Sequence, residues 1–154
     1  MPARRRLRLV ALLGGVAALG VAASAMAPAP PAPAMLVYKT PTCGCCKKWV
    51  DHVKAAGFTV TAKDLPDLTE IKAEVGVKPA QQSCHTALVG GYVIEGHVPA
   101  DLVQQLLREQ PKDVIGLAAP GMPMGSPGME GLVKEKYDII AMKKDGTQRV
   151  YATR

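Results

Sequence analysis

The chain has 154 residues, of which 48% are hydrophobic, enough for one compact domain once its ends are set aside. Its formal net charge is +6 at pH 7, but the first 25 residues hold four arginines and no acidic residue. The rest of the chain therefore has 15 basic against 13 acidic residues and a charge of only +2. This balance removes the electrostatic case for nucleic-acid binding.

The first 25 residues are typical of a secretory signal peptide. A basic region that includes Arg4, Arg5, Arg6 and Arg8 precedes the apolar residues 9–22 and small residues suited to cleavage. We expect cleavage after Ala25 rather than after Ala27, because Pro28 follows Ala27. An uncleaved membrane anchor is disfavoured, since the apolar run is short for a span of about 20 residues. The prediction is an exported protein with no membrane contact after cleavage.

The residues after the signal divide into a tether and a single domain. Residues 26–34 are rich in proline and alanine, a composition that predicts an extended polyproline-like tether. The domain is expected to occupy residues 35–154.

The first half of this domain alternates between strand and helix patterns. The apolar residues 35–38 predict a strand, and apolar residues spaced three or four apart between Trp49 and Ala56 predict a helix that stops at Gly57. Residues 58–61 alternate as a second strand. The spacing of Asp67 and Glu70 is that of a capping box and predicts a short helix before Gly76.

The second half begins with a predicted hairpin. Residues 86–89 and 92–95 flank two glycines, which accept the positive φ that a two-residue turn requires. Pro99 fits the first turn of a helix that ends before Pro111. An Asp145-Gly146 signal predicts a last hairpin from residues 137–142 and 148–151, which either extends the sheet or covers the preceding loop. The expected fold is α/β, with a βαβαββα core, a Met-rich loop and a C-terminal β-hairpin.

Three of the four cysteines, Cys43, Cys45 and Cys46, lie within four residues between the first strand and the first helix. A helix N-terminus favours an anion, and Lys47 and Lys48 add positive charge, so we expect lowered thiol pKa values in this turn. Cys43 and Cys46 alone have the Cys-x-x-Cys redox spacing. A third soft sulfur in the same turn favours Cu(I).

Two other interpretations of the cysteines stay open. Four cysteines in an exported domain ordinarily form two structural disulfides, although the adjacent Cys45 and Cys46 strain that pattern. Four thiolates could also bind zinc tetrahedrally, but three cysteines in one turn do not match the usual structural zinc spacing.

The element order, with a cysteine turn after the first strand, resembles the thioredoxin and glutaredoxin fold over about residues 35–110. In that fold a cis-proline before the third strand faces the redox turn, whereas here Cys84 and His85 occupy the place. We therefore expect a fourth sulfur and an imidazole to face the cysteine turn.

Four segments together resemble a bacterial family of formerly unknown function, whose best-understood branch is the CopG-type periplasmic copper-resistance proteins. The segments are 40–46, 83–86, 91–99 and 120–129. The resemblance implies a thioredoxin-like domain that holds copper at a sulfur-rich site and takes part in copper redox chemistry. It implies that the copper ligands are Cys43, Cys45, Cys46 and Cys84, with His85, Met122, Met124 and Met129 as weaker candidates.

The methionines and the other candidate residues have plainer alternatives. Proline and glycine exclude regular structure from residues 119–129, so the three methionines either contribute thioethers to the site or fill gaps beneath the loop. We expect His97 to make a structural hydrogen bond and His52 to face solvent. Trp49 is expected to pack in the core or to cover the site.

The leading hypothesis is a periplasmic copper-binding protein that sequesters Cu(I) and carries out copper redox chemistry, which would make it a copper oxidoreductase. Its expected partners are copper ions and a periplasmic copper-transport or electron-transfer protein. The first alternative is a thiol-disulfide oxidoreductase with Cys43 as nucleophile and Cys46 as resolving thiol. The second is an interaction module in which the cysteines only form structural disulfides.

Overall fold

The computed structural model describes residues 33–154, and within them the chain forms seven strands, three α-helices and one short 3-10 helix, Pro79–Gln81. The predicted signal peptide and most of the predicted tether lie outside the described residues. Strand β1 (Ala34–Lys39) begins at the last residue of that tether. No helix in residues 33–154 has the length and apolar character that crossing a membrane requires.

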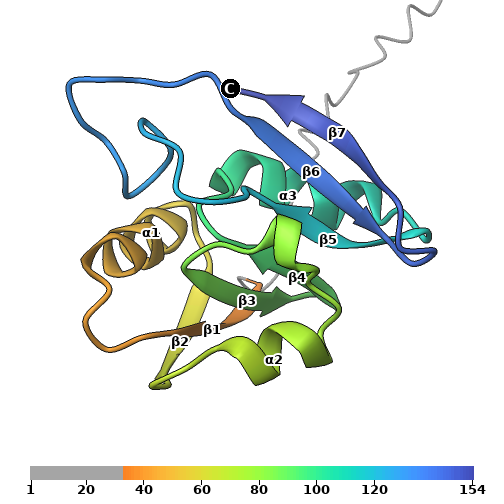
Figure 1. The fold of residues 1–154 in the computed structure, drawn as a ribbon, viewed down its shortest axis with the longest axis horizontal. Coiled ribbons are helices and arrows are strands. Elements are labelled where there is room, and N and C mark those ends of the chain that lie inside the picture. The colour runs from red at the N-terminus through yellow and green to blue at the C-terminus, as the bar shows by residue number, and fades with distance from the viewer. Residues whose placement is uncertain (1–32) are drawn as a thin grey trace, which may run out of the picture. The chain divides into compact units, whose positions relative to one another are not determined.

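The seven strands form one mixed sheet in the order β2-β1-β3-β4-β5-β6-β7 (Figure 1). The β1–β2 and β4–β5 pairs are parallel and the other four neighbouring pairs are antiparallel. The strands after β1 are β2 (Thr59–Asp64), β3 (His85–Val89), β4 (Tyr92–Glu95), β5 (Val114–Ala118), β6 (Asp138–Lys143) and β7 (Gln148–Thr153). The α/β class is the one that the sequence predicts.

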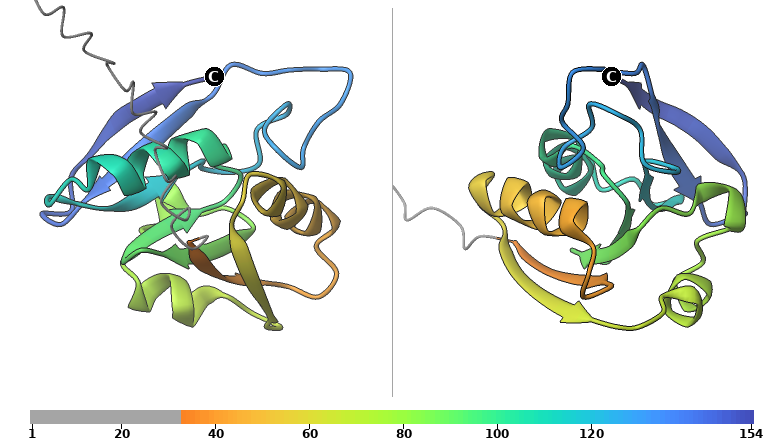
Figure 2. Two further views of the ribbon diagram at one scale, coloured as in Figure 1. Left: turned by 180° about the vertical axis from the view of Figure 1, so that it is seen from behind. Right: turned by 60° about the vertical axis from the view of Figure 1, so that its left-hand side comes forward.

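Helices cover both faces of the sheet. Helices α1 (Gly44–Ala55) and α3 (Ala100–Glu109) lie on one face, and the shorter α2 (Thr69–Glu74) lies on the other (Figures 1 and 2). The main core lies under α1 and α3 and includes Trp49, Val53, Ile94, Leu106 and Leu117, all with no exposed surface. A smaller cluster on the face of α2 contains Val77, Val93, Ala118 and Met142.

The hairpin of β3 and β4 has the two-glycine turn that the sequence predicts. Gly90 and Gly91 have φ of 57° and 82°, and Val89 pairs with Tyr92 across the turn. Residues with a Cβ rarely adopt positive φ at two successive positions, which is why glycine occupies both. This turn fixes the register of β3, whose first residue is His85.

Strand β5 is not among the elements that the sequence pattern predicts. Its middle residue is Gly116, which weakens a strand signal, but the backbone of Val93 on β4 lies so close that no side chain fits there. Since β5 pairs with β6, the C-terminal hairpin extends the sheet rather than covering the Met-rich loop. The sequence signal for this strand is the short, mainly apolar run of residues 114–118, which follows a turn.

Two helix starts differ in detail from the sequence prediction. The carboxylate of Asp67 accepts hydrogen bonds from the amide and hydroxyl of Thr69 instead of forming a capping box with Glu70. Pro99 is the residue before α3 rather than a residue of its first turn.

Candidate metal centre

The cysteine turn joins β1 to α1, as predicted. Cys43 is the N-cap residue of α1, and its Sγ accepts a hydrogen bond from the amide of Cys46 at 3.2 Å. The Sγ atoms of Cys43 and Cys45 are 3.4 Å apart. The N-cap and first turn of α1 therefore hold three sulfurs. Cys43 both caps the helix and is a candidate ligand.

Cys43 and Cys46 are joined by a disulfide, with their Cα atoms 5.3 Å apart. Cys45 and Cys84 are free thiols, so the interpretation with two structural disulfides is wrong for this structure. Cys43 and Cys46 can bind a metal as thiolates only after this disulfide is reduced.

Cys84, the residue immediately before β3, lies against the cysteine turn. Its carbonyl oxygen is 3.8 Å from the Sγ of Cys46. Candidate ligand atoms of Cys43, Cys45, Cys46 and Cys84 all lie within 4.8 Å of one another. The tertiary structure thus brings together the four cysteines that the resemblance implies as ligands, and a set of four sulfurs fits a soft metal ion.

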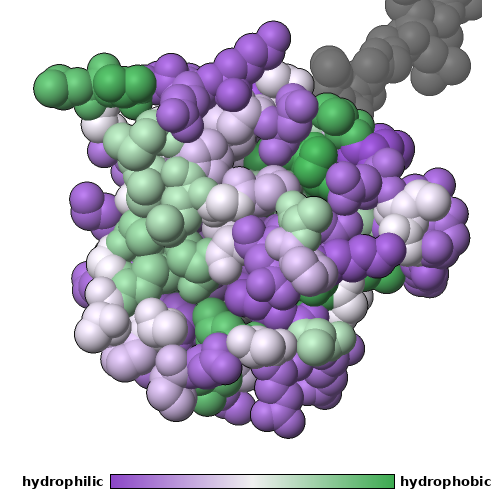
Figure 3. Space-filling model, in the orientation of Figure 1, coloured by the Kyte–Doolittle hydropathy of each residue, from purple (hydrophilic) through white to green (hydrophobic). Residues whose placement is uncertain are grey.

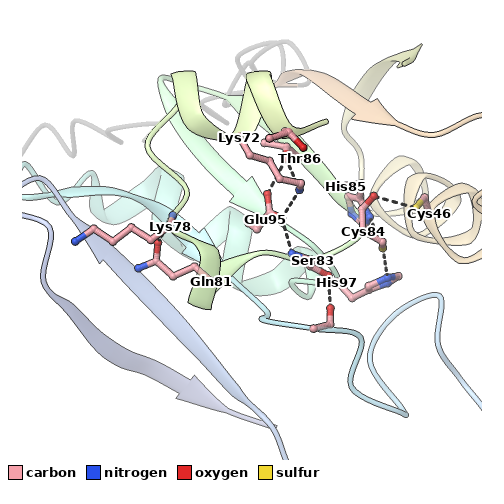
Figure 4. A network of polar contacts seen from close by, with 12 residues as sticks. Cys46, Lys72, Lys78, Gln81, Ser83, Cys84, His85, Thr86, Glu95 and His97 are labelled. Atoms are coloured by element: carbon pink, nitrogen blue, oxygen red, sulfur yellow. Dashed lines mark hydrogen bonds and ion pairs between the residues drawn. The ribbon is translucent and has the colours of Figure 1, made fainter. Parts of the chain in front are cut away.

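His85 and His97 lie beside the Cys84 thiol (Figure 4). The Sγ of Cys84 is 3.3 Å from Nδ1 of His85 and 2.9 Å from Nε2 of His97. Cys84, His85 and His97 form a second group whose candidate ligand atoms lie within 4.8 Å of one another. His97 also makes the structural hydrogen bond expected of it, to the carbonyl of Pro127 at 2.8 Å, but its position beside Cys84 was missed. The Gly96-His97 pair directly after the predicted strand 92–95 was the available signal.

The Met-rich loop packs on the site through its backbone. A Cβ at Gly128 would lie 2.7 Å from the carbonyl oxygen of Cys45 and 3.4 Å from Nδ1 of His97, so only glycine fits between them. Met122 is 52% exposed, and Met124 and Met129 are half-buried. The methyl carbon of Met124 is near Gly131. Gly128 therefore lies against the cysteine turn, and Pro127 contacts His97. The predicted thioether ligands stay a prediction.

Trp49 both packs in the core and covers the site. Its side chain is fully buried, its Nε1 donates to the carbonyl of Val98 at 2.9 Å, and its ring lies 4.4 Å from that of His85. The prediction for His52 is wrong, because His52 is half-buried and its Nε2 accepts a hydrogen bond from the amide of Ala100. It caps α3, since α1 and α3 share one face of the sheet.

A buried ion pair lies next to the segment that carries Cys84. Nζ of Lys72 on α2 is 2.5 Å from Oε1 of Glu95 on β4, and it also donates to the hydroxyl of Thr86 (Figure 4). The carboxylate of Glu95 accepts hydrogen bonds from the amide of Ser83 and the hydroxyl of Thr86. Because Ser83 precedes Cys84 in the chain, this network fixes the segment that carries the thiol.

Burial dominates the electrostatics of the site. It raises the pKa of the Cys84 thiol to about 12, with a further contribution from the nearby Cys45, so Cys84 is protonated at neutral pH when no metal is bound. Burial lowers the pKa values of His85 and His97, which keeps both imidazoles neutral and able to bind metal. The lowered pKa predicted for the turn does not apply to Cys43 and Cys46 while the disulfide joins them.

These features define the class: an α/β protein with a cysteine-rich centre whose donors could hold a metal ion. Two solved structures with the titles "Copper resistance protein copG", forms 1 and 2, are each 39% identical to the chain. They cover 80–81% of this chain and 98% of their own, with TM-scores of 0.75 and 0.76. Residues 81–129 also match the family described as "Protein of unknown function, DUF411". No curated protein matches the chain significantly.

The chain belongs to the copper resistance protein CopG family. The matched residues 81–129 include Cys84, His85, His97 and the Met-rich loop, and the solved structures also extend to most of the remaining chain.

Proposed function

We propose that the chain is an exported periplasmic protein that sequesters Cu(I) on cysteine thiolates and takes part in copper redox chemistry in copper resistance. The observation that carries the proposal is the group of four sulfurs within 4.8 Å, from the first turn of α1 with its N-cap and from the segment before β3. Membership of the CopG family supports copper as the ion.

The donor set favours copper over zinc. Cys43, Cys45 and Cys46 share one helical turn, a spacing unlike that of structural zinc sites. Thiolates gathered in one turn can also bridge neighbouring Cu(I) ions. Cys46 is buried, and Cys43, Cys45 and Cys84 are half-buried. This partial shielding from water favours a soft ion over a strongly hydrated one.

The fold supports the proposal of a thioredoxin-like relationship. The cysteine turn follows β1, the position that the resemblance implies, and strands β2, β1, β3 and β4 are neighbours in that order. The same arrangement would expose the site to an electron-transfer or copper-transport partner at the N-terminus of α1.

Anaerobic titration of the fully reduced chain with Cu(I) tests the proposed function. We expect thiolate-to-copper charge-transfer absorption that saturates above one copper per chain. A parallel titration with Zn(II) is the control for general thiolate binding. Stoichiometric Zn(II) binding without Cu(I) binding would contradict the proposal.

The Cys43–Cys46 disulfide favours a second candidate function, thiol-disulfide exchange. Cys43 is half-buried at the N-terminus of α1, where the helix favours its thiolate as a nucleophile, and Cys46 is buried as a resolving thiol would be. This function predicts that insulin reduction survives Cys45→Ser and Cys84→Ser but is lost in Cys43→Ser. Loss of reduction in all three variants would contradict an exchange reaction that uses only Cys43 and Cys46.

A further inference from the structure

One of the two free thiols, Cys84, lies next to the Cys43–Cys46 disulfide although it belongs to a separate segment of the chain. It comes 38 residues after Cys46, and its Sγ lies within 4.8 Å of both sulfurs of the disulfide. A thiolate attacks a disulfide directly at sulfur, so a free cysteine at this distance can exchange with the bond. The fold therefore places Cys84 as an internal nucleophile for the disulfide.

His97 offers an acceptor for the proton of the Cys84 thiol. Its Nδ1 lies 2.8 Å from the carbonyl oxygen of Pro127, an acceptor only, so Nδ1 carries the proton and donates it. Its Nε2 then has the lone pair, and this atom lies 2.9 Å from the Sγ of Cys84. A nucleophile, a base and a group that orients the base together activate a cysteine for attack. Cys84, His97 and the Pro127 carbonyl have this arrangement.

The helix N-terminus decides which sulfur of the disulfide is attacked. The side chain of Cys46 is buried, and its Sγ lies 3.8 Å from the carbonyl oxygen of Cys84 (Figure 4). The Sγ of Cys43 caps α1 and accepts a hydrogen bond from the amide of Cys46. This position stabilises negative charge on the Cys43 sulfur, and a sulfur that holds negative charge well leaves faster. Attack at Cys46 with departure of Cys43 is the favoured direction.

We propose that Cys84 exchanges with the Cys43–Cys46 disulfide inside the folded chain, with His97 as the base. The proton of the Cys84 thiol passes to Nε2 of His97, and the Cys84 sulfur bonds to the Cys46 sulfur. The bond between Cys43 and Cys46 breaks, and Cys43 leaves as a thiolate. As this thiolate takes up a proton, His97 releases one, so the numbers of disulfides, thiols and protons are unchanged and no outside oxidant or reductant is needed.

The exchange moves a free thiol from the segment before β3 to the N-terminus of α1. The new disulfide joins α1 covalently to that segment, while Cys43 becomes free beside the exposed Gly44. The oxidised chain thus gains the nucleophile that the second candidate function assigns to Cys43 and still holds one disulfide. The reaction goes beyond the proposed function and does not depend on it, because it takes place within one chain and uses neither copper nor a substrate disulfide.

Alkylation of the oxidised, metal-free chain with Cys45→Ser tests the exchange. Intact mass first verifies that this chain holds one disulfide and one thiol, so the position of a single iodoacetamide label, mapped by peptide fragmentation, shows which cysteine is free. Without exchange only Cys84 is labelled. We expect label on Cys43, together with a linked peptide pair that contains the Cys46–Cys84 disulfide.

His97→Gln in the same background tests the base. The rate of Cys43 labelling is measured at iodoacetamide concentrations at which it no longer rises, where it equals the rate of exchange. We expect His97→Gln to lower this rate about 100-fold, the lower end of what a general base contributes. His52→Gln is the matched control and should keep the parental rate, since His52 caps α3 and does not contact the thiols.

The near-ultraviolet circular dichroism of Trp49, the only tryptophan, shows whether each variant keeps its core packing, and His97→Asn replaces His97→Gln if this signal is lost. Label confined to Cys84 would overturn the proposal, and this outcome needs no His97 variant. Equal rates in folded His97 and His52 variants would also overturn it. A chain that shows the exchange but does not reduce insulin would uphold this proposal and remove only the second candidate function.

Discussion

A Cys84→Ser chain is expected to bind at least one Cu(I) fewer than the parent chain when both are fully reduced. Cys84 provides the only sulfur of the group that does not come from the N-cap and first turn of α1, so it completes the site from a separate segment of the chain. A serine hydroxyl is a hard donor that does not replace a bridging thiolate for Cu(I). The measurement is the number of Cu(I) ions bound at saturation in an anaerobic titration.

Met122→Leu and Met124→Leu are the comparison for this variant. A neutral thioether contributes less than a thiolate, and Met122 is 52% exposed, so we expect these variants to keep the stoichiometry and at most to weaken one copper. A Cys84→Ser chain with unchanged stoichiometry would remove Cys84 from the Cu(I) site and favour a smaller, mononuclear site in the turn.

A Lys72→Met chain is expected to lose about 3–5 kcal/mol of unfolding free energy, the usual cost of leaving one charge of a buried ion pair without its partner. Lys72 and Glu95 have side-chain exposures of 7% and 0%, so water cannot replace the lost ammonium group. Burial already raises the pKa of Glu95 against the opposing effect of Lys72, and the variant would raise it further. Urea denaturation of the metal-free, reduced chain measures the change.

Two further variants make this prediction specific. Lys72→Met combined with Glu95→Gln should recover part of the loss, because no uncompensated charge remains in the interior. Lys47→Met is the control for the loss of a lysine, since the Lys47–Asp51 pair is solvent-exposed and such pairs contribute little. If Lys72→Met were as stable as Lys47→Met, the buried pair would not stabilise the segment before Cys84.

Figure 3 shows apolar side chains that project from the upper left of the molecule, where Figure 1 has the loop between β5 and β6. Leu132 and Val133 in this loop are highly exposed, at 107% and 61%. The loop has no helix or strand around these residues, so it has no regular apolar face that could pack against the core. The order within this loop comes instead from local hydrogen bonds, such as that from the amide of Gly125 to the carbonyl of Met129.

The sequence alone determined the features that depend on neighbours along the chain. The strand, cysteine turn and helix of residues 34–55 follow from an apolar run, an N-cap and a helical period, and the hairpin of residues 85–95 follows from two adjacent glycines. The same local patterns placed Cys43, Cys45 and Cys46 together, and the family resemblance added Cys84.

Only the tertiary structure decided which distant residues meet at Cys84. His97 lies 13 positions from Cys84, and its partner Pro127 lies 30 positions further on, so no periodic pattern could connect the three. The Cys43–Cys46 disulfide, the pairing of Lys72 with Glu95 and the capping of α3 by His52 likewise depend on how elements pack against one another. Hydrophobic periodicity specifies which face of an element is buried, but side-chain partners between elements are fixed by the strand order and the loop that closes over the site.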